Sequence, residues 1–138
     1  MEGASVNASF ACAFSPNSKK LVMINEQEGI DIFYLEARTF RLRHHNIHTF
    51  TKQINAICWP IEHLILVATE KTIRLIGFDE LVDYGGKELV GHSDKIREVL
   101  ADVPHCRFVS MSSREIIVWS SEPPFLLLAK IPSPSPLR

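Results

Sequence analysis

Short apolar segments recur along this chain at a constant interval. Three of them end on the bulky side chains Phe33, Ile76 and Trp119, and successive ends lie 43 residues apart. The segment Ile73–Ile76 alternates apolar and polar positions, which is the period of a strand, and no stretch of similar length shows an apolar stripe of helical period. The pattern therefore predicts three copies of one strand-rich unit, with almost no helix.

Within each copy the predicted strands follow the same order and are separated by turn-forming residues. The first copy has strands at Phe10–Phe14, Leu21–Ile24, Ile30–Phe33 and Thr39–Leu42. The second has strands at Ile54–Trp59, Leu64–Ala68, Ile73–Ile76 and Lys87–Val90, with a turn at Pro60 after the first. The third has strands at Ile96–Ala101, Phe108–Met111, Ile116–Trp119 and Phe125–Ile131, with a turn at 102–104. The sequence thus predicts an all-β fold of three four-stranded antiparallel units.

These features resemble the WD40 β-propeller family, whose repeats span about 40 to 45 residues. Family members carry a Gly-His dipeptide ahead of the first strand of a repeat and a Trp-Asp pair at the end of the third. Gly91-His92 and Trp119 stand at these places in the third copy. The resemblance implies a buried hydrogen-bonded set formed by that His, a strand hydroxyl, a turn Asp and the Trp, with Ser110 in the hydroxyl role.

The chain also departs from the family pattern. Ser113 stands where the turn Asp is expected, and Ser120 replaces the Asp after the Trp. Phe33 and Ile76 take the place of Trp in the other two copies, and His48 is only a loosely aligned counterpart of His92. We therefore expect the hydrogen-bonded set to be mostly missing, so that stability comes mainly from the apolar faces of neighbouring blades.

Three blades are fewer than the four to eight of a closed propeller. We expect an incomplete ring, and hence either a fragment or truncated form of a longer propeller, or a chain whose ring is completed by another copy or another protein. The domain organisation predicted on this basis is a lead-in at 1–7, blades at 8–46, 47–90 and 91–131 that together form a partial WD40 propeller over 8–131, and a Pro/Ser-rich tail at 132–138.

The composition is that of a globular domain. Of the 138 residues, 46% are apolar, and 15 basic side chains balance 16 acidic ones, which argues against a nucleic-acid-binding protein. Cys12, Cys58 and Cys106 are odd in number and form no close pair, which favours a reducing compartment. No apolar run approaches the length of a membrane span. The sequence predicts a soluble, cytoplasmic chain without membrane association, and it leaves a nuclear location open.

Two clusters of reactive side chains are better explained by a structural role than by metal binding or catalysis. His44, His45 and His48 lack a carboxylate or cysteine at metal-binding spacing, so we expect a connecting loop and no metal site. The segment 91–94 brings together His, Ser and Asp, but a catalytic triad is assembled from separated positions. We therefore predict no catalytic residue and no cofactor.

The function expected from a repeat array is a non-catalytic protein-protein interaction scaffold. By family resemblance, the recognition rim draws on the loops that enter strand one and join strands two and three. The residues at these loops are Gln53, Asn55, Lys71, Lys95, Arg97 and Arg114. The alternatives are a structural subunit that completes a propeller by homo- or hetero-oligomerisation, and a nonfunctional truncation. Ser133 and Ser135, each followed by Pro, are candidates for phosphorylation in the tail.

Overall fold

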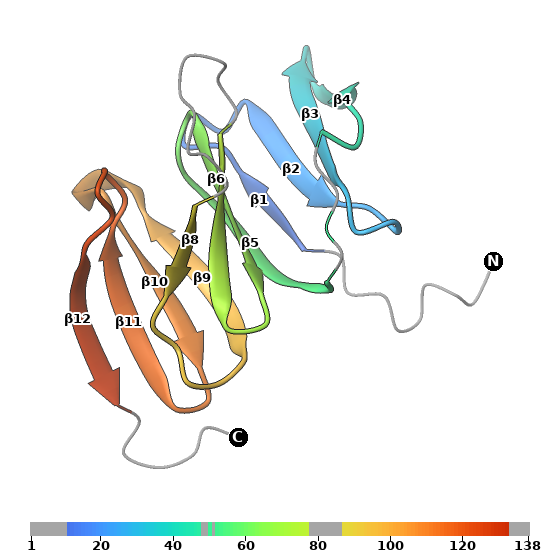
Figure 1. The fold of residues 1–138 in the computed structure, drawn as a ribbon. Helices are drawn as coiled ribbons and strands as arrows, with labels where there is room; N and C mark the ends of the chain where they lie inside the picture. Colours follow the sequence, from blue (N-terminus) through green and yellow to red (C-terminus); the bar gives the residue numbers. More distant parts are fainter. Residues whose placement is uncertain (1–10, 48–49, 51, 78–86, 133–138) are drawn as a thin grey trace.

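The chain forms three four-stranded antiparallel sheets (Figure 1), here called blades 1, 2 and 3. The computed structural model describes residues 11–47, 50, 52–77 and 87–132. The predicted all-β class and the three sets of four strands are confirmed, and the described residues form no closed ring. The predicted lead-in, His48, Ser133 and Ser135 lie outside the described residues.

Each blade is a simple up-and-down sheet in which consecutive strands are neighbours. Blade 1 contains β1 (Cys12–Phe14), β2 (Lys20–Ile24), β3 (Ile30–Glu36) and β4 (Thr39–His44). Blade 2 contains β5 (Ile54–Ile61), β6 (Leu64–Thr69), β7 (Thr72–Gly77) and β8 (Glu88–Val90). Blade 3 contains β9 (Ile96–Asp102), β10 (Arg107–Ser112), β11 (Glu115–Ser120) and β12 (Leu127–Pro132).

Two predicted boundaries are wrong, each for a local reason. Pro60 lies inside β5 and is buried, and the turn follows at Glu62 and His63. Because β5 is an edge strand and its pairing shifts register between Cys58 and Ile61, a proline is tolerated there. Phe125 is not part of the last strand, because it is buried between blades 2 and 3 and β12 begins only at Leu127.

Helical structure among the described residues is limited to one short 3-10 turn, η2 (Val103–His105), where the sequence predicts a turn. It joins β9 to β10 and is followed by Cys106 in the left-handed region, at φ 52°. No helix within the described ranges is long and apolar enough to cross a membrane.

The hydrophobic core lies between the blades rather than inside any one of them. One apolar cluster joins blades 1 and 2 and includes Val22, Ile32 and Trp59. A second cluster joins blades 2 and 3 and includes Leu66, Phe108 and Trp119. Figure 1 shows blade 2 between the other two. Blade 2 is therefore covered on both faces, and all six residues of β6 are buried.

Candidate functional site

Three hairpins and the chain segments that enter the following blades meet at one end of the stack, which we call the entry rim. The hairpins join the second and third strands of each blade, at 25–29, 70–71 and 113–114. The described entering segments are 52–53, ahead of β5, and 91–95, ahead of β9. Antiparallel pairing brings these parts together, because a strand that ends at one rim is followed by a strand that begins there.

A repeated backbone contact fixes this rim. The Phe50 amide donates to the carbonyl of Glu28 at 3.0 Å, and the Ile96 amide donates to the carbonyl of Glu70 at 2.8 Å. Glu28 and Glu70 both adopt the left-handed conformation, at φ 57°. One contact ties the hairpin of blade 1 to Phe50, ahead of β5, and the other ties the hairpin of blade 2 to the first residue of β9, so neighbouring blades are held in register at the rim.

Blade 3 contains a buried chain of four hydrogen-bonded side chains. Trp119 Nε1 donates to Ser110 Oγ at 2.8 Å, and Ser110 Oγ lies 2.6 Å from His92 Nε2. His92 Nδ1 lies 3.0 Å from Glu115 Oε1. All four residues are buried. A carboxylate only accepts, so Nδ1 of His92 carries the proton, and Nε2 accepts from the Ser110 hydroxyl.

The environment of this set favours a neutral histidine beside a charged glutamate. Burial lowers the pKa of His92, and the neighbouring Glu115 opposes that shift only in part. Burial alone raises the pKa of Glu115, but hydrogen bonds from Ser93 and His92 outweigh it and hold the pKa below its ordinary value. The Ser93 amide donates to Glu115 Oε1 at 2.9 Å and the Ser93 hydroxyl to Oε2 at 3.1 Å. The loop ahead of β9 is thereby fastened to the start of β11.

The expectation that this set is mostly missing does not hold for blade 3. The acidic member is Glu115, the first residue of β11, and not the turn position Ser113. Ser113 instead donates from its hydroxyl to Asp94 Oδ2 at 2.6 Å. The sequence signal that was missed is a glutamate at the start of an apolar strand.

Gly91 packs closely against two side chains of β11. A Cβ added there would lie 3.1 Å from Ile117 Cδ1 and 3.2 Å from the Trp119 ring, which is tighter than ordinary van der Waals contact. The Gly-His dipeptide therefore combines two roles: Gly91 lets the chain approach the indole, and His92 enters the hydrogen-bonded set.

The predicted repeat residues of the other blades have no such set among the described residues. Phe33 is half-buried and pairs with Leu21 across β2 and β3, on the face of blade 1 that is turned away from blade 2. Ile76 is half-buried and packs against the cluster between blades 1 and 2. Ile76 therefore contributes apolar packing between blades, Phe33 adds an apolar side chain to the outward face of blade 1, and Trp119 contributes a hydrogen bond as well.

Blade 1 has a polar cluster of its own near the rim, which the sequence did not predict. Asp31 is 8% exposed, and its Oδ1 accepts from the Asn46 amide and from Asn25 Nδ2, each at 3.0 Å. The same oxygen lies 2.9 Å from His45 Nδ1. Its only sequence signal is an acid between two buried isoleucines, in Ile30-Asp31-Ile32.

The predicted partner-binding residues at the entry rim differ in how exposed their side chains are. Five of them are exposed, namely Gln53, Lys71, Lys95, Arg97 and Arg114. Asn55 is only half-buried within β5, and its Nδ2 is buried with no hydrogen-bond partner among the described residues. Arg97 is the extra residue where the pairing of β9 with β10 shifts register. A bulge of this kind turns a side chain out of the sheet.

Positive charge is concentrated where blades 2 and 3 form the rim. The exposed cations there are Lys52, Lys71, Lys95, Arg97 and Arg114. The acids there are Glu70, Asp94 and Glu98, of which Glu98 directly follows Arg97 on β9, together with the buried Glu115. A hydrogen bond from Ser113, the Lys95 amide and the nearby Arg114 lower the pKa of Asp94, so it stays ionised. The surface therefore has an excess of cations in an otherwise nearly neutral chain.

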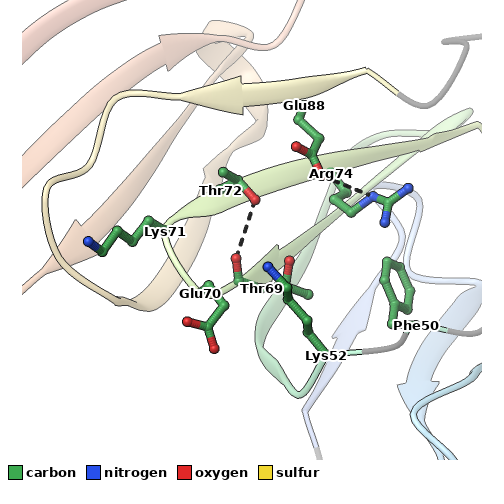
Figure 2. Close-up of a pocket in the computed structure, with 8 residues that line it drawn as sticks. All are labelled: Phe50, Lys52, Thr69, Glu70, Lys71, Thr72, Arg74 and Glu88. Atoms are coloured by element: carbon green, nitrogen blue, oxygen red, sulfur yellow. Dashed lines mark hydrogen bonds and ion pairs between the residues drawn. The ribbon is translucent and has the colours of Figure 1, made fainter.

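A pocket of about 340 Å³ opens beside these cations (Figure 2). Phe50 and Lys52 line it from the segment entering β5, and Arg74 lines it from β7. Arg74 lies with its guanidinium 5.5 Å from the centre of the Phe50 ring, and its Nε is 3.6 Å from Glu88 Oε2. The pocket thus combines an aromatic wall with a positioned guanidinium.

His44, the last residue of β4, and His45, which follows it, do not share a common partner among the described residues. His45 lies against Asp31, whereas the ring of His44 lies 5.5 Å from that of Tyr34. Across the residues that the structure describes, no three His, Cys, Asp or Glu side chains are grouped as metal ligands.

None of the protein-family models matches the chain, and no curated protein matches it either.

Proposed function

We propose that this chain is a non-catalytic protein-protein interaction scaffold of the WD40 propeller type, which binds an acidic segment of a partner protein at the entry rim of blades 2 and 3. Three features of the sequence and fold support the WD40 assignment. They are the 43-residue interval, the four-stranded blades, and the set of His92, Ser110, Trp119 and Glu115. The acidic member of that set differs in position from the family pattern.

The observation that carries the proposal is the excess of exposed cations on a rim that backbone contacts hold in place. Lys95 and Arg97 flank Ile96, whose amide is bonded to Glu70 of the neighbouring blade. Because the backbone is fixed there, these side chains lose less backbone entropy on binding than the same charges on a free loop, so each contributes more. Complementary charge also steers the approach of a partner and selects against basic segments.

The test compares labelled peptides of equal length that are acidic, neutral or basic. We expect the acidic peptide to bind best, with an affinity that falls as salt is added, and the double variant Lys95→Glu/Arg97→Glu to bind it about ten-fold more weakly. Fluorescence anisotropy measures the binding, and thermal unfolding shows whether the variant is folded.

The matched control reverses two exposed cations at the opposite end of blade 1, Lys19→Glu/Arg38→Glu. It makes the same change in net charge without touching the rim of blades 2 and 3. Equal binding of acidic and basic peptides, or equal loss of binding in both double variants, would refute the proposal.

A further inference from the structure

Each blade presents apolar side chains to the blade that follows it. In blade 1 the cross-strand pair Val22 and Ile32 fills this face, and both residues are 0% exposed. In blade 2 the equivalent pair on the second and third strands is Leu66 and Leu75, which are 0% and 2% exposed. These pairs form the contact between consecutive blades.

Blade 3 carries the same arrangement, but no blade follows it among the described residues. Val109 pairs with Val118 and Met111 pairs with Ile116, and these four side chains point away from blade 2. They are half-buried, and Leu100, which pairs with Val109, is 50% exposed. We call this surface the trailing face. Its apolar side chains are of the same kind as those in the contacts between blades, but no neighbouring blade in the described part of the chain covers them.

Blade 1 exposes the complementary half, which we call the leading face. There Leu21 pairs with Phe33, just as Phe108 pairs with Trp119 on the side of blade 3 that packs against blade 2. Phe14, which pairs with Leu21, is 57% exposed, and Leu42, which pairs with Phe33, is 48% exposed. Cys12 and Met23 continue the same face.

We propose that a second copy of this chain covers both faces, with blade 3 of each copy packed against blade 1 of the other. Every blade contact inside the chain is head-to-tail, joining the trailing side of one blade to the leading side of the next. The two open faces are therefore opposite halves of one kind of contact, and a second copy supplies both missing halves. Two copies contribute six blades, which is within the four to eight of closed propellers.

The closed arrangement accounts for both apolar faces at once. In a ring made by a two-fold axis, the same contact occurs twice and no apolar face is left in water. A symmetric dimer through the trailing face alone would leave both leading faces exposed. This assembly uses the blade faces and not the entry rim, so it stands or falls independently of the acidic-segment proposal.

Complementation between two variants tests the head-to-tail contact. Val118→Arg disrupts the trailing face and Phe33→Arg disrupts the leading face, and each change affects both contacts of the ring. We expect the unmodified chain to have twice the mass of the 15.6 kDa chain by light scattering, and each variant alone to be monomeric. Mixing the two variants restores one intact contact, so the mixture is expected to form a dimer. The matched control, Val90→Arg, adds a charge at a valine that is 71% exposed on β8, away from both faces, and leaves the dimer unchanged.

Cysteine alkylation gives a second readout that does not depend on mass. Cys12 lies on the leading face, Cys106 is exposed in the loop ahead of β10, and Cys58 is buried, which raises the pKa of its thiol. Val118→Arg is expected to increase the alkylation rate of Cys12 about ten-fold, because the partner copy no longer covers it, while Cys106 is unchanged. Reaction of Cys58 would instead reveal unfolding.

Three results would overturn the proposal. They are a folded monomer of the unmodified chain at all concentrations, a dimer that only one of the two variants disrupts, and a mixture of variants that stays monomeric. Open polymers of increasing mass would exclude the closed ring.

Discussion

At the scale of single residues, Glu115 determines the polar interior of blade 3. It accepts from His92 and from both the amide and the hydroxyl of Ser93, and its side chain is only 7% exposed. Removing one partner from a buried charged network leaves the others unsatisfied, which costs more than the network itself contributes. The consequence is that Glu115 holds both the histidine and the loop that forms part of the entry rim.

Substitution of this glutamate tests that role. We expect Glu115→Ala to lower the free energy of unfolding by about 2–4 kcal/mol, and Glu115→Gln by less, because an amide oxygen still accepts from His92 or Ser93. Urea unfolding measures both. Glu122→Ala is the control, since the exposed Glu122 carboxylate makes no hydrogen bond or ion pair within the described residues, and it is expected to change stability by less than about 0.5 kcal/mol. Equal effects of Glu115→Ala and Glu122→Ala would contradict the account.

The same site predicts how stability depends on pH. The pKa of His92 in the folded chain lies below its ordinary value of 6.5, so just below pH 6.5 the unfolded chain binds a proton that the folded chain does not. The contribution of His92 to the free energy of unfolding is therefore fully present above pH 6.5, and it is lost as the pH is lowered. Glu115, whose pKa is held below 4.5, adds a further loss of the same sign below pH 4.5.

Unfolding by urea between about pH 7.5 and 5.5 measures the contribution of His92. We expect the stability of His92→Gln to vary less steeply over this range than that of the unmodified chain, because the substitution removes only the contribution of His92. Parallel profiles would show that His92 does not contribute.

At the scale of strands, the order and pairing were predictable because each strand combines a short apolar run with a turn on either side. Twelve strands in three sheets follow from that pattern. Pro60 misled the prediction because proline is both a turn former and acceptable in an edge strand, and only the sheet order distinguishes the two. Phe125 misled it because an aromatic residue next to an apolar run looks like part of a strand.

The candidate site was predictable only where the family spacing fixes it. Spacing identified His92, Ser110 and Trp119, which the structure brings together, but it pointed to Ser113 for the acid. Glu115 could not be assigned from sequence because a charged residue at the start of a strand is usually solvated. The cluster at Asp31 and the pocket at Arg74 each depend on residues that are distant in the sequence, and only strand pairing within blades 1 and 2 brings them together.

At the scale of the whole molecule, the central feature is that the core lies between blades. Blade 2 has an apolar cluster on each face, whereas blades 1 and 3 each have one covered face and one open face. Blade 2 therefore depends on both neighbours, and the three blades are expected to unfold as a unit. The same arrangement leaves the leading and trailing faces available for a second copy.

Amide hydrogen exchange resolved by strand tests this feature most directly. We expect the slowest exchange in β6, whose six residues are all buried, and fast exchange in β12, whose six residues are all exposed. Intermediate rates are expected for β2 and β10, the second strands of the flanking blades. If the amides of β6 exchange as fast as those of β12, blade 2 is not enclosed by its neighbours, and the stacked-blade account is wrong.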